Sequence, residues 1–341
     1  MAALLVGGTQ GLVLLQEQPY GWEVWERTDR EWAGRRVWAL AETRQGLLAG
    51  TDAGLLCSTD RGGSWALILP EQIRTIASHP AVAGRLFAGA QPAAVWRSDD
   101  GGETWGQLAG PGTAEERARW HLPGATPLET VPIARVGAFA FDPRAPEIVY
   151  AGIEIGGVYR SDDGGEGWEA RNEGLLSLDV HQFAPHPLEP ETVFAATETG
   201  VYRTVDGGDR WEPLPLDAGA EYTRALVALP HAGPGDPPVL LAGPAEVDPW
   251  GWAEEADGAR CRLMRSEDDG ATWRHLGIAA GVPDHFEGLI STFVVDPADP
   301  YTVWLGTWDG RVYVSRDRGE NWLQIAEDLG EIWVLCPLAE E

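Results

Sequence analysis

Short apolar runs separated by turn-forming residues recur along the whole chain. Residues 148–152 and 157–160 form one pair of runs around a glycine-containing turn, and 192–196 with 200–203 and 302–306 with 310–313 repeat the arrangement. Another apolar run ending in Asp-Pro or His-Pro precedes each pair, as at 137–143. Runs of this length bounded by Gly, Pro and Asp predict β-strands rather than helices. Each unit therefore contains three predicted strands, A to C, and a fourth, D, follows the motif described next.

An eight-residue motif, S/T-x-D-x-G-x-x-W, closes each unit and is called the box below. Its six copies are 58–65, 98–105, 161–168, 204–211, 266–273 and 315–322. Ser, Thr and Asp side chains hydrogen-bond to nearby backbone in turns, glycine supplies a positive φ, and the tryptophan starts the returning strand. The box therefore predicts a C–D hairpin turn with structural aspartates, namely Asp60, Asp100, Asp163, Asp206, Asp268 and Asp317. Calcium binding is the alternative, but the residues lack the spacing of an EF-hand loop.

The spacing of the boxes predicts the architecture. Successive box tryptophans are 40 to 63 residues apart, and four strands per unit of roughly 40–45 residues are typical of a β-propeller blade. The two ends of the chain supply one more unit: 331–337 matches strand A, 3–7 and 11–15 match strands B and C, and Trp22 replaces the box tryptophan. We predict an all-β, seven-bladed propeller of four-stranded antiparallel blades, a single domain over residues 1–341. Its ring is closed by N- and C-terminal strands that share one blade.

Composition narrows the possible partners. The 341 residues carry a net charge of −28, which repels phosphate, so nucleic acid and anionic membranes are poor partners. The three cysteines are scattered and form neither a disulfide framework nor a zinc motif. The N-terminal residues lack the basic segment and long apolar run of a signal peptide or membrane span. We therefore expect a cytoplasmic protein.

The six boxes resemble those of the BNR/Asp-box repeat superfamily, and the resemblance covers nearly the whole chain. It implies a propeller similar to sialidases, xyloglucanases, sortilin-type receptors and photosystem II assembly factors, and leaves the activity open. Sialidases use an arginine triad, a Tyr–Glu pair and an acid/base aspartate; here Glu221 and Tyr222 are adjacent, but the F/Y-R-I-P element is missing. Xyloglucanases place catalytic aspartates between two propellers, whereas this sequence predicts one.

The long connections are expected on the face opposite the boxes. Alternating strand directions put A–B and C–D turns on one face and B–C and D–A connections on the other. Insertions at 109–133, 243–259 and 276–289 are of the latter two kinds, and such loops often carry function. Their recognition candidates are Trp120, His121, Trp250, Trp252 and His285. The alternative is that the tryptophans only attach their loops to the blades.

Basic residues recur where strand A begins, near the expected channel mouth on the same face. They are Arg36, Arg74, Arg135, His181 and Arg224. Guanidinium groups there could bind a carboxylate or phosphate. Alternatively, each arginine pairs with an acidic residue of a neighbouring blade.

Two functions remain open. The first is a non-catalytic binding or assembly module whose loop face holds a small anionic or carbohydrate ligand or a protein partner. The absence of a complete catalytic constellation favours it. The second is a glycoside hydrolase-like enzyme, sialidase-like or a lyase, that uses paired loop carboxylates. The candidates for that chemistry are Asp248, Glu254, Asp284, Glu287 and Glu221 with Tyr222. We expect no cofactor and no metal, although His121, His181 and His285 could converge in space.

Overall fold

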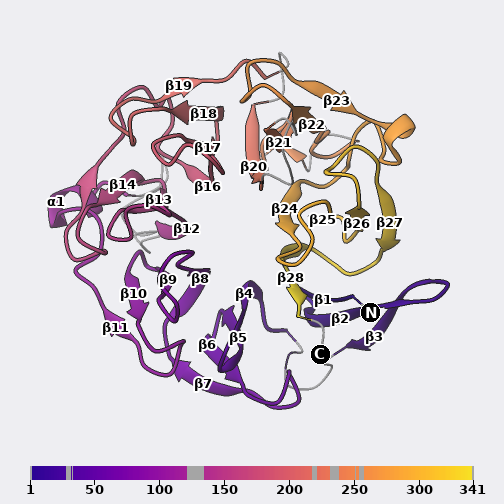
Figure 1. Ribbon diagram of the computed structural model, residues 1–341, viewed down its shortest axis with the longest axis horizontal. Coiled ribbons are helices and arrows are strands. Elements are labelled where there is room, and N and C mark those ends of the chain that lie inside the picture. Colours follow the sequence, from indigo (N-terminus) through magenta and orange to yellow (C-terminus); the bar gives the residue numbers. More distant parts are fainter. Residues whose placement is uncertain are drawn as a thin grey trace. The chain divides into compact units, whose positions relative to one another are not determined.

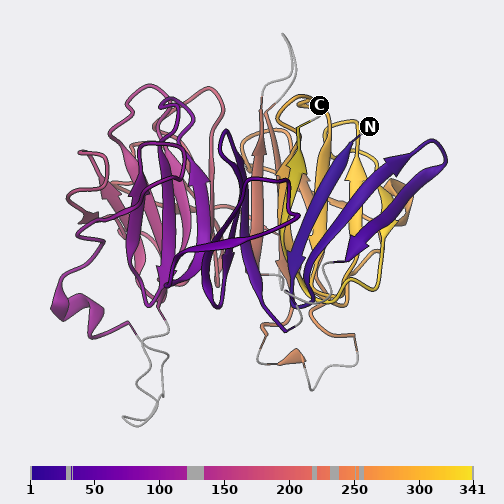
Figure 2. The ribbon, with the colours of Figure 1, turned by 90° about the horizontal axis from the view of Figure 1, so that it is seen from below.

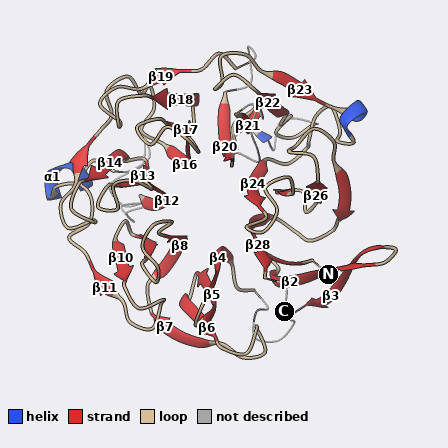
Figure 3. Cartoon of the chain, viewed as in Figure 1, coloured by secondary structure: helices blue, strands red, loops and turns tan. Residues whose placement is uncertain are grey.

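The computed structural model describes residues 2–27, 32, 34–120, 134–216, 221–230, 238–249, 251–252 and 257–339. These residues form seven four-stranded antiparallel sheets, which confirms the predicted seven-bladed β-propeller. We number the blades 1 to 7 in chain order, and blade 1 is the one that contains both ends of the chain. Figure 3 shows that strands dominate every blade.

Contacts divide the chain into two compact units, which are described separately. Unit 1 comprises Met1–Val37, Glu198–Val201 and Leu214–Glu341, and unit 2 comprises Trp38–Thr197 and Tyr202–Pro213. Blades 1, 6 and 7 therefore lie in unit 1, and blades 2 to 5 lie almost entirely in unit 2. That residues 1–341 form one domain stays a prediction.

Unit 1 contains the strands of three blades (Figure 1). Blade 1 consists of β28 (Ile332–Leu338), β1 (Ala3–Gly8), β2 (Gly11–Gln18) and β3 (Gly21–Arg27). Blade 6 consists of β20 (Tyr222–Leu229), β21 (Val239–Ala245), β22 (Leu263–Ser266) and β23 (Arg274–Leu276). Blade 7 consists of β24 (Ile290–Val295), β25 (Val303–Thr307), β26 (Val312–Ser315) and β27 (Leu323–Ala326). A 3₁₀ helix, Ile278–Ala280, lies between blades 6 and 7 in sequence.

Unit 2 contains the other four blades. Blade 2 consists of β4 (Val37–Thr43), β5 (Gly46–Thr51), β6 (Gly54–Ser58) and β7 (Ala66–Leu69). Blade 3 consists of β8 (Gln72–Ser78), β9 (Leu86–Gln91), β10 (Val95–Ser98) and β11 (Gly106–Gln107). Blade 4 consists of β12 (Arg135–Phe141), β13 (Val149–Glu154), β14 (Gly157–Ser161) and β15 (Glu169–Ala170). Blade 5 consists of β16 (Val180–Pro185), β17 (Val193–Thr197), β18 (Gly200–Thr204) and β19 (Glu212–Pro213). The helix α1 (Ala114–Arg117) precedes blade 4.

Burial follows the position of a strand in its blade. The second strands β13, β17 and β21 are buried at every residue, because they lie inside their sheets and contribute to the apolar core clusters of their own units. Their sequences are accordingly continuous apolar runs. The outer strands β11, β15 and β19 are exposed. No helix in the described residues combines the length and the apolar character needed to cross a membrane.

Blade 1 joins the two ends of the chain. Strand β1 pairs antiparallel with β2 on one side and with β28 on the other, and Leu5 lies opposite both Leu14 and Cys336. Trp22 on β3 packs against the core of the blade. The predicted split blade is therefore confirmed, and the N-terminal strand β1 is paired along both of its sides.

The six boxes share one hydrogen-bond pattern. In the box of blade 3, the Ser98 hydroxyl donates to Asp100 (2.7 Å) and accepts from the Gly102 amide (2.9 Å). The same aspartate accepts from the Thr104 amide at 2.9 Å, and Gly102 has a φ of 102°. Each box is thus a self-contained turn, which explains why its residues recur at fixed spacing.

Candidate functional site

The connections of blade 6 form a loop cluster at the end of the blade opposite its box. The B–C connection follows β21 and the D–A connection follows β23. Figure 2 shows an orange segment of the B–C connection beyond the strand ends. Cys261 links them, because it forms β-bridges with both Ala245 and Phe286. The Ala259 amide also donates to the Glu287 carbonyl at 2.7 Å. Contacts between residues far apart in the sequence, such as Ala259 and Glu287, therefore hold the two insertions together.

Two tryptophans and an arginine form the aromatic part of this cluster. The rings of Trp252 and Trp308 meet edge to face with centroids 5.3 Å apart, and the Arg224 guanidinium lies 5.5 Å from the Trp308 ring. The Trp252 indole N–H donates to the Val247 carbonyl at 2.9 Å. The Trp308 indole N–H is buried and finds no acceptor among the described residues. This group therefore combines two partly exposed indole rings with a cation.

A charged network borders the aromatic group. Glu246 accepts from Arg260 at 2.6 Å and also from Arg262. Arg262 in turn donates to Nε2 of His285 at 3.2 Å. Burial acts to raise the pKa of Glu246, but the hydrogen bond from Arg260 and the positive charges outweigh it and lower that pKa. Glu246 therefore stays ionised and holds the two arginines in place.

A second charged group lies at Arg311 in the B–C turn of blade 7. Its guanidinium Nε lies 3.5 Å from a carboxylate oxygen of Asp309. Burial acts to lower the pKa of Arg311, but Asp309, Tyr313 and Glu287 raise it. Burial also raises the pKa of Tyr313. Asp309 and Glu287 thus act on one cation, although they lie on different connections.

The remaining loop candidates of unit 1 mostly support the backbone. Asp284 accepts from the Ile278 amide at 3.3 Å and Asp248 from the Gly251 amide at 3.1 Å. Glu221 is exposed, whereas Tyr222 packs against the core of blades 6 and 7. Arg36 is also exposed. The candidates His121, Trp250 and Glu254 lie outside the described residues.

The strand-A residues of unit 2 already have partners within the unit. Arg135 forms an ion pair with Glu154, which is opposite it on β13 of the same blade. The Arg74 guanidinium stacks 3.7 Å from the Trp38 ring. His181 is buried, and its Nε2 lies 3.5 Å from Asp179. Arg135 therefore pairs with an acidic residue of its own blade. The alternative to ligand binding had been a pairing with an acidic residue of a neighbouring blade.

The insertion at 109–133 also has an aromatic residue at its base. Trp120 is 7% exposed and packs edge to face on Tyr159, with centroids 5.8 Å apart. The Arg117 guanidinium lies 6.0 Å from the Trp120 ring and donates to the carbonyls of Pro111 and Gly112. Trp120 therefore fixes the connection to blade 4. Its ring is not presented to solvent as a ligand platform.

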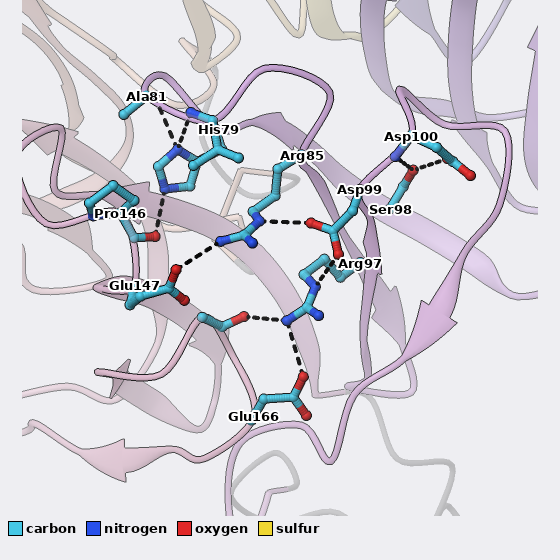
Figure 4. Close-up of polar contacts among 12 residues, drawn as sticks. His79, Ala81, Arg85, Arg97, Ser98, Asp99, Asp100, Pro146, Glu147 and Glu166 are labelled. Atoms are coloured by element: carbon cyan, nitrogen blue, oxygen red, sulfur yellow. Dashed lines mark hydrogen bonds and ion pairs between the residues drawn. The ribbon is translucent and has the colours of Figure 1, made fainter.

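A network of arginine hydrogen bonds and ion pairs at the box end of unit 2 was not predicted from the sequence (Figure 4). Arg97 of blade 3 donates to the Gly164 carbonyl in the box of blade 4 at 3.0 Å and to Glu166 at 3.1 Å. Arg85 donates to Asp99 at 2.8 Å and forms a longer contact with Glu147. The sequence does contain a pattern that could have predicted this network. An arginine precedes the first box residue in four boxes, namely Arg97, Arg160, Arg203 and Arg265.

His79 belongs to the same end of the unit and serves its turn. Its Nδ1 accepts from the Ala81 and Val82 amides at 3.1 Å, and its Nε2 lies 2.9 Å from the Pro146 carbonyl of the next blade. Burial lowers the pKa of His79. Asp142 fills the equivalent place in blade 4. Within the described residues, no group of three or more His, Cys, Asp or Glu side chains is arranged to hold a metal ion.

Comparisons with known proteins place the chain among β-propellers. No family model matches it. An oligoxyloglucan reducing-end-specific xyloglucanase from Emericella nidulans is 30% identical over 197 residues, which cover 53% of this chain and 22% of that protein. A GH74 enzyme from Niastella koreensis superposes with a TM-score of 0.61 at 16% identity, covering 84% of this chain and 45% of the enzyme.

Two further structures give the same picture. A GH74 xyloglucanase from Xanthomonas campestris has a TM-score of 0.58 at 17% identity and covers 86% of this chain and 45% of that enzyme. The protein YCF48, solved with a D1 peptide, has a TM-score of 0.53 at 16% identity and covers 84% of this chain and 81% of its own. These likenesses confirm the resemblance to xyloglucanase-like and assembly factor-like propellers at the level of the fold. The chain spans about a fifth of the curated xyloglucanase and less than half of either GH74 enzyme.

Proposed function

We propose that this propeller binds an oligosaccharide of the xyloglucan class at the loop cluster of unit 1. The observation that carries the proposal is the Trp252–Trp308 pair beside Arg224, with both rings partly exposed. Sugar rings present C–H faces that pack on aromatic rings and hydroxyls that need both donors and acceptors. The sequence relative supports the same ligand class, because that protein is a xyloglucanase.

The polar side chains around the pair suit a neutral, hydroxyl-rich ligand. Glu246 pairs with Arg260 and Arg262, and Arg260 also pairs with Asp257. Two carboxylates therefore balance two guanidinium groups and hold them in place. The surface of this network would exchange hydrogen bonds with hydroxyls without the cost of burying an unpaired charge. The net charge of −28 works against a polyanionic ligand. Binding of a protein partner and a location in the cytoplasm stay predictions.

Hydrolysis of the bound saccharide is the second candidate function. Glycoside hydrolysis needs two carboxyl groups on either side of the scissile bond, one of them able to donate a proton. The lowered pKa of Glu246 makes it a poor proton donor. Glu287 and Asp309 lie on two connections that meet where the Trp308 amide donates to the Leu289 carbonyl at 2.9 Å, and both contribute to the raised pKa of Arg311. If the protein is an enzyme, we infer that these two residues carry the reaction.

The test is isothermal titration with xyloglucan oligosaccharides, with cello-oligosaccharides and sialyllactose as comparison ligands. We expect Trp308→Ala and Trp252→Ala each to weaken binding of the xyloglucan oligosaccharide by about tenfold or more, which corresponds to about 1.4 kcal/mol. Tyr301→Ala is the matched control, because this exposed ring lies in blade 7 at the end carrying the box. Absence of saccharide binding, or unchanged affinity in both tryptophan variants, would overturn the proposal.

A parallel assay decides between binding and hydrolysis. Release of reducing ends from xyloglucan is measured for the parent protein, Glu287→Gln and Asp309→Asn. We expect either substitution to abolish any activity that the parent shows. Binding without release of reducing ends assigns the site to recognition alone.

A further inference from the structure

The hairpin between β2 and β3 is the place where blade 1 departs from the other six blades. It lacks the box, and a two-residue turn, Pro19 and Tyr20, joins Gln18 directly to Gly21. Its outer strand β3 has seven residues, whereas the outer strands of the other blades in the described chain have two to four. The hairpin extends from the blade as the indigo ribbon of Figure 1. Loss of the box has therefore produced a long outer edge.

Two aromatic side chains are exposed on this hairpin. Tyr20 at the turn is fully exposed, and Trp25 is 62% exposed. The register shifts from Leu15 opposite Val24 to Leu14 opposite Glu26, so Trp25 has no partner on β2 and forms a β-bulge. A bulge changes the direction of its side chain. This local irregularity keeps Trp25 in solvent while Trp22 packs into the blade.

The surroundings of these rings are also unusual for a propeller edge. Val24 on β3 and Leu323 on the neighbouring strand β27 are exposed as well, and β27 contacts β3. Outer strands are normally short or carry charges that prevent unwanted pairing. Exposed apolar groups that gather in one place mark a binding surface more often than scattered ones do. The edge of β3 therefore has the character of a contact surface.

Charge restricts the class of ligand that this surface can bind. The chain carries a net charge of −28, and the exposed Glu23 lies between the two rings in sequence. Nearby, Glu17 forms an ion pair with Arg316 at 2.5 Å. A polyanion and a second copy of this acidic chain are both repelled. A neutral polyhydroxylated chain is not, and it can use the ring faces, the free peptide groups of the edge strand and the Glu23 carboxylate.

We propose that Tyr20, Trp25 and the outer edge of β3 form a second carbohydrate-binding surface, which takes an extended neutral polysaccharide. The choice of ligand class rests on the proposed function of the loop cluster. Because a strand rises about 3.3 Å per residue, the two aromatic residues are roughly 15 Å apart along the hairpin. Such a spacing needs a ligand several sugar rings long. The surface therefore retains the polymer, and the loop cluster at the opposite end of blades 6 and 7 binds a short segment.

Affinity gel electrophoresis in polymeric xyloglucan, paired with titration of a short xyloglucan oligosaccharide, tests this assignment. We expect the double substitution Tyr20→Ala with Trp25→Ala to weaken polymer binding at least tenfold and to leave oligosaccharide binding unchanged. Leu176→Ala, at an exposed position between β15 and β16, is the control for loss of exposed apolar area without loss of a ring. Tyr20→Phe with Trp25→Phe keeps the ring faces and should retain most of the polymer affinity, which separates ring stacking from misfolding.

The outcomes distinguish the two sites. Trp308→Ala should weaken oligosaccharide binding; if it has no effect while the β3 variant loses polymer affinity, the loop-cluster proposal fails and the β3 surface stands. Unchanged polymer affinity in the β3 variant, or no polymer binding by the parent, overturns the β3 proposal. A basic peptide of alternating Lys and Val is titrated in parallel. If the β3 variant loses affinity for that peptide and not for xyloglucan, the edge is a protein-docking strand and the carbohydrate assignment is wrong.

Discussion

Arg97 of blade 3 donates a hydrogen bond to the Gly164 carbonyl in the box of blade 4, with an N···O distance of 3.0 Å. Arg160 of blade 4 repeats the contact with the Gly207 carbonyl of blade 5 at 2.8 Å. In unit 1, Arg265 of blade 6 lies 3.4 Å from the Arg318 carbonyl of blade 7. In these three pairs of blades, the arginine that precedes one box thus binds the box turn of the next blade. The box is therefore both a turn within a blade and the acceptor of a contact between blades.

Loss of this contact should weaken the fold of unit 2. Arg97→Ala removes a charged donor that serves Asp99, Gly164 and Glu166. Hydrogen bonds from charged groups contribute about 1.5–3 kcal/mol, so we expect the free energy of unfolding in urea to fall by about that amount. Arg119→Ala is the control, because its exposed ion pair with Glu115 on α1 should contribute less than about 1 kcal/mol. Equal losses in both variants would contradict the role of Arg97.

The box aspartates should make stability depend on pH in the acid range. Hydrogen bonds from the Thr104 hydroxyl, the Thr104 amide and the Ser98 hydroxyl lower the pKa of Asp100 from 3.8 to about 2. Ser64 and Ser58 do the same for Asp60. Because the folded pKa lies below the unfolded one, the stabilisation is fully present above about pH 4 and is lost as the pH falls towards 2.

Melting temperatures between pH 2 and pH 6 test this dependence. The double variant Asp60→Asn with Asp100→Asn should have a lower melting temperature at pH 6 and a shallower decline towards pH 2. A decline as steep as that of the parent protein would show that other carboxylates dominate the acid response.

The box tryptophans should differ in their contribution to stability. Trp211 is 1% exposed, stacks on Phe183 with centroids 6.3 Å apart, and donates to the Arg171 carbonyl at 2.9 Å. Trp168 is only partly buried, and its indole N–H has no acceptor in the described chain. We expect Trp211→Ala to cost about 3–5 kcal/mol and Trp168→Ala clearly less. Chemical denaturation of the two variants side by side measures the difference, and the reverse order would contradict it.

Arg135 and Arg224 begin equivalent strands but should respond differently to substitution. Arg135→Ala removes the cation paired with Glu154, whose side chain is 9% exposed, and should cost on the order of 3 kcal/mol of stability. Arg224 stacks on the partly exposed Trp308, so Arg224→Ala should weaken saccharide binding while the melting temperature changes little. Differential scanning calorimetry with saccharide titration separates the two effects. A stability loss in Arg224→Ala as large as that in Arg135→Ala would make both residues structural.

The candidate site was only partly predictable. Trp252, Arg224, Glu287 and His285 were singled out from their place on long connections and strand starts. Trp308, Glu246 and Arg262 were not, because a tryptophan in a short B–C turn and charged residues in an acidic chain carry no distinctive spacing. Arg262 reaches Glu246 and His285 only after Cys261 has brought two connections together. A contact of that kind depends on backbone positions that are far apart in the sequence.

The sequence by itself determined the number of blades, the shared blade of the two chain ends and the location of the boxes. It could do so because each box closes its turn with hydrogen bonds among eight consecutive residues. The pattern of residue types in the box therefore specifies the local structure. Tertiary structure alone decided the partners of the strand-A arginines, the pairing of Trp252 with Trp308 and the exposure of Trp25. Those outcomes depend on side chains from separate connections and on a one-residue shift in strand register. Neither feature produces a repeating pattern of residues in the sequence.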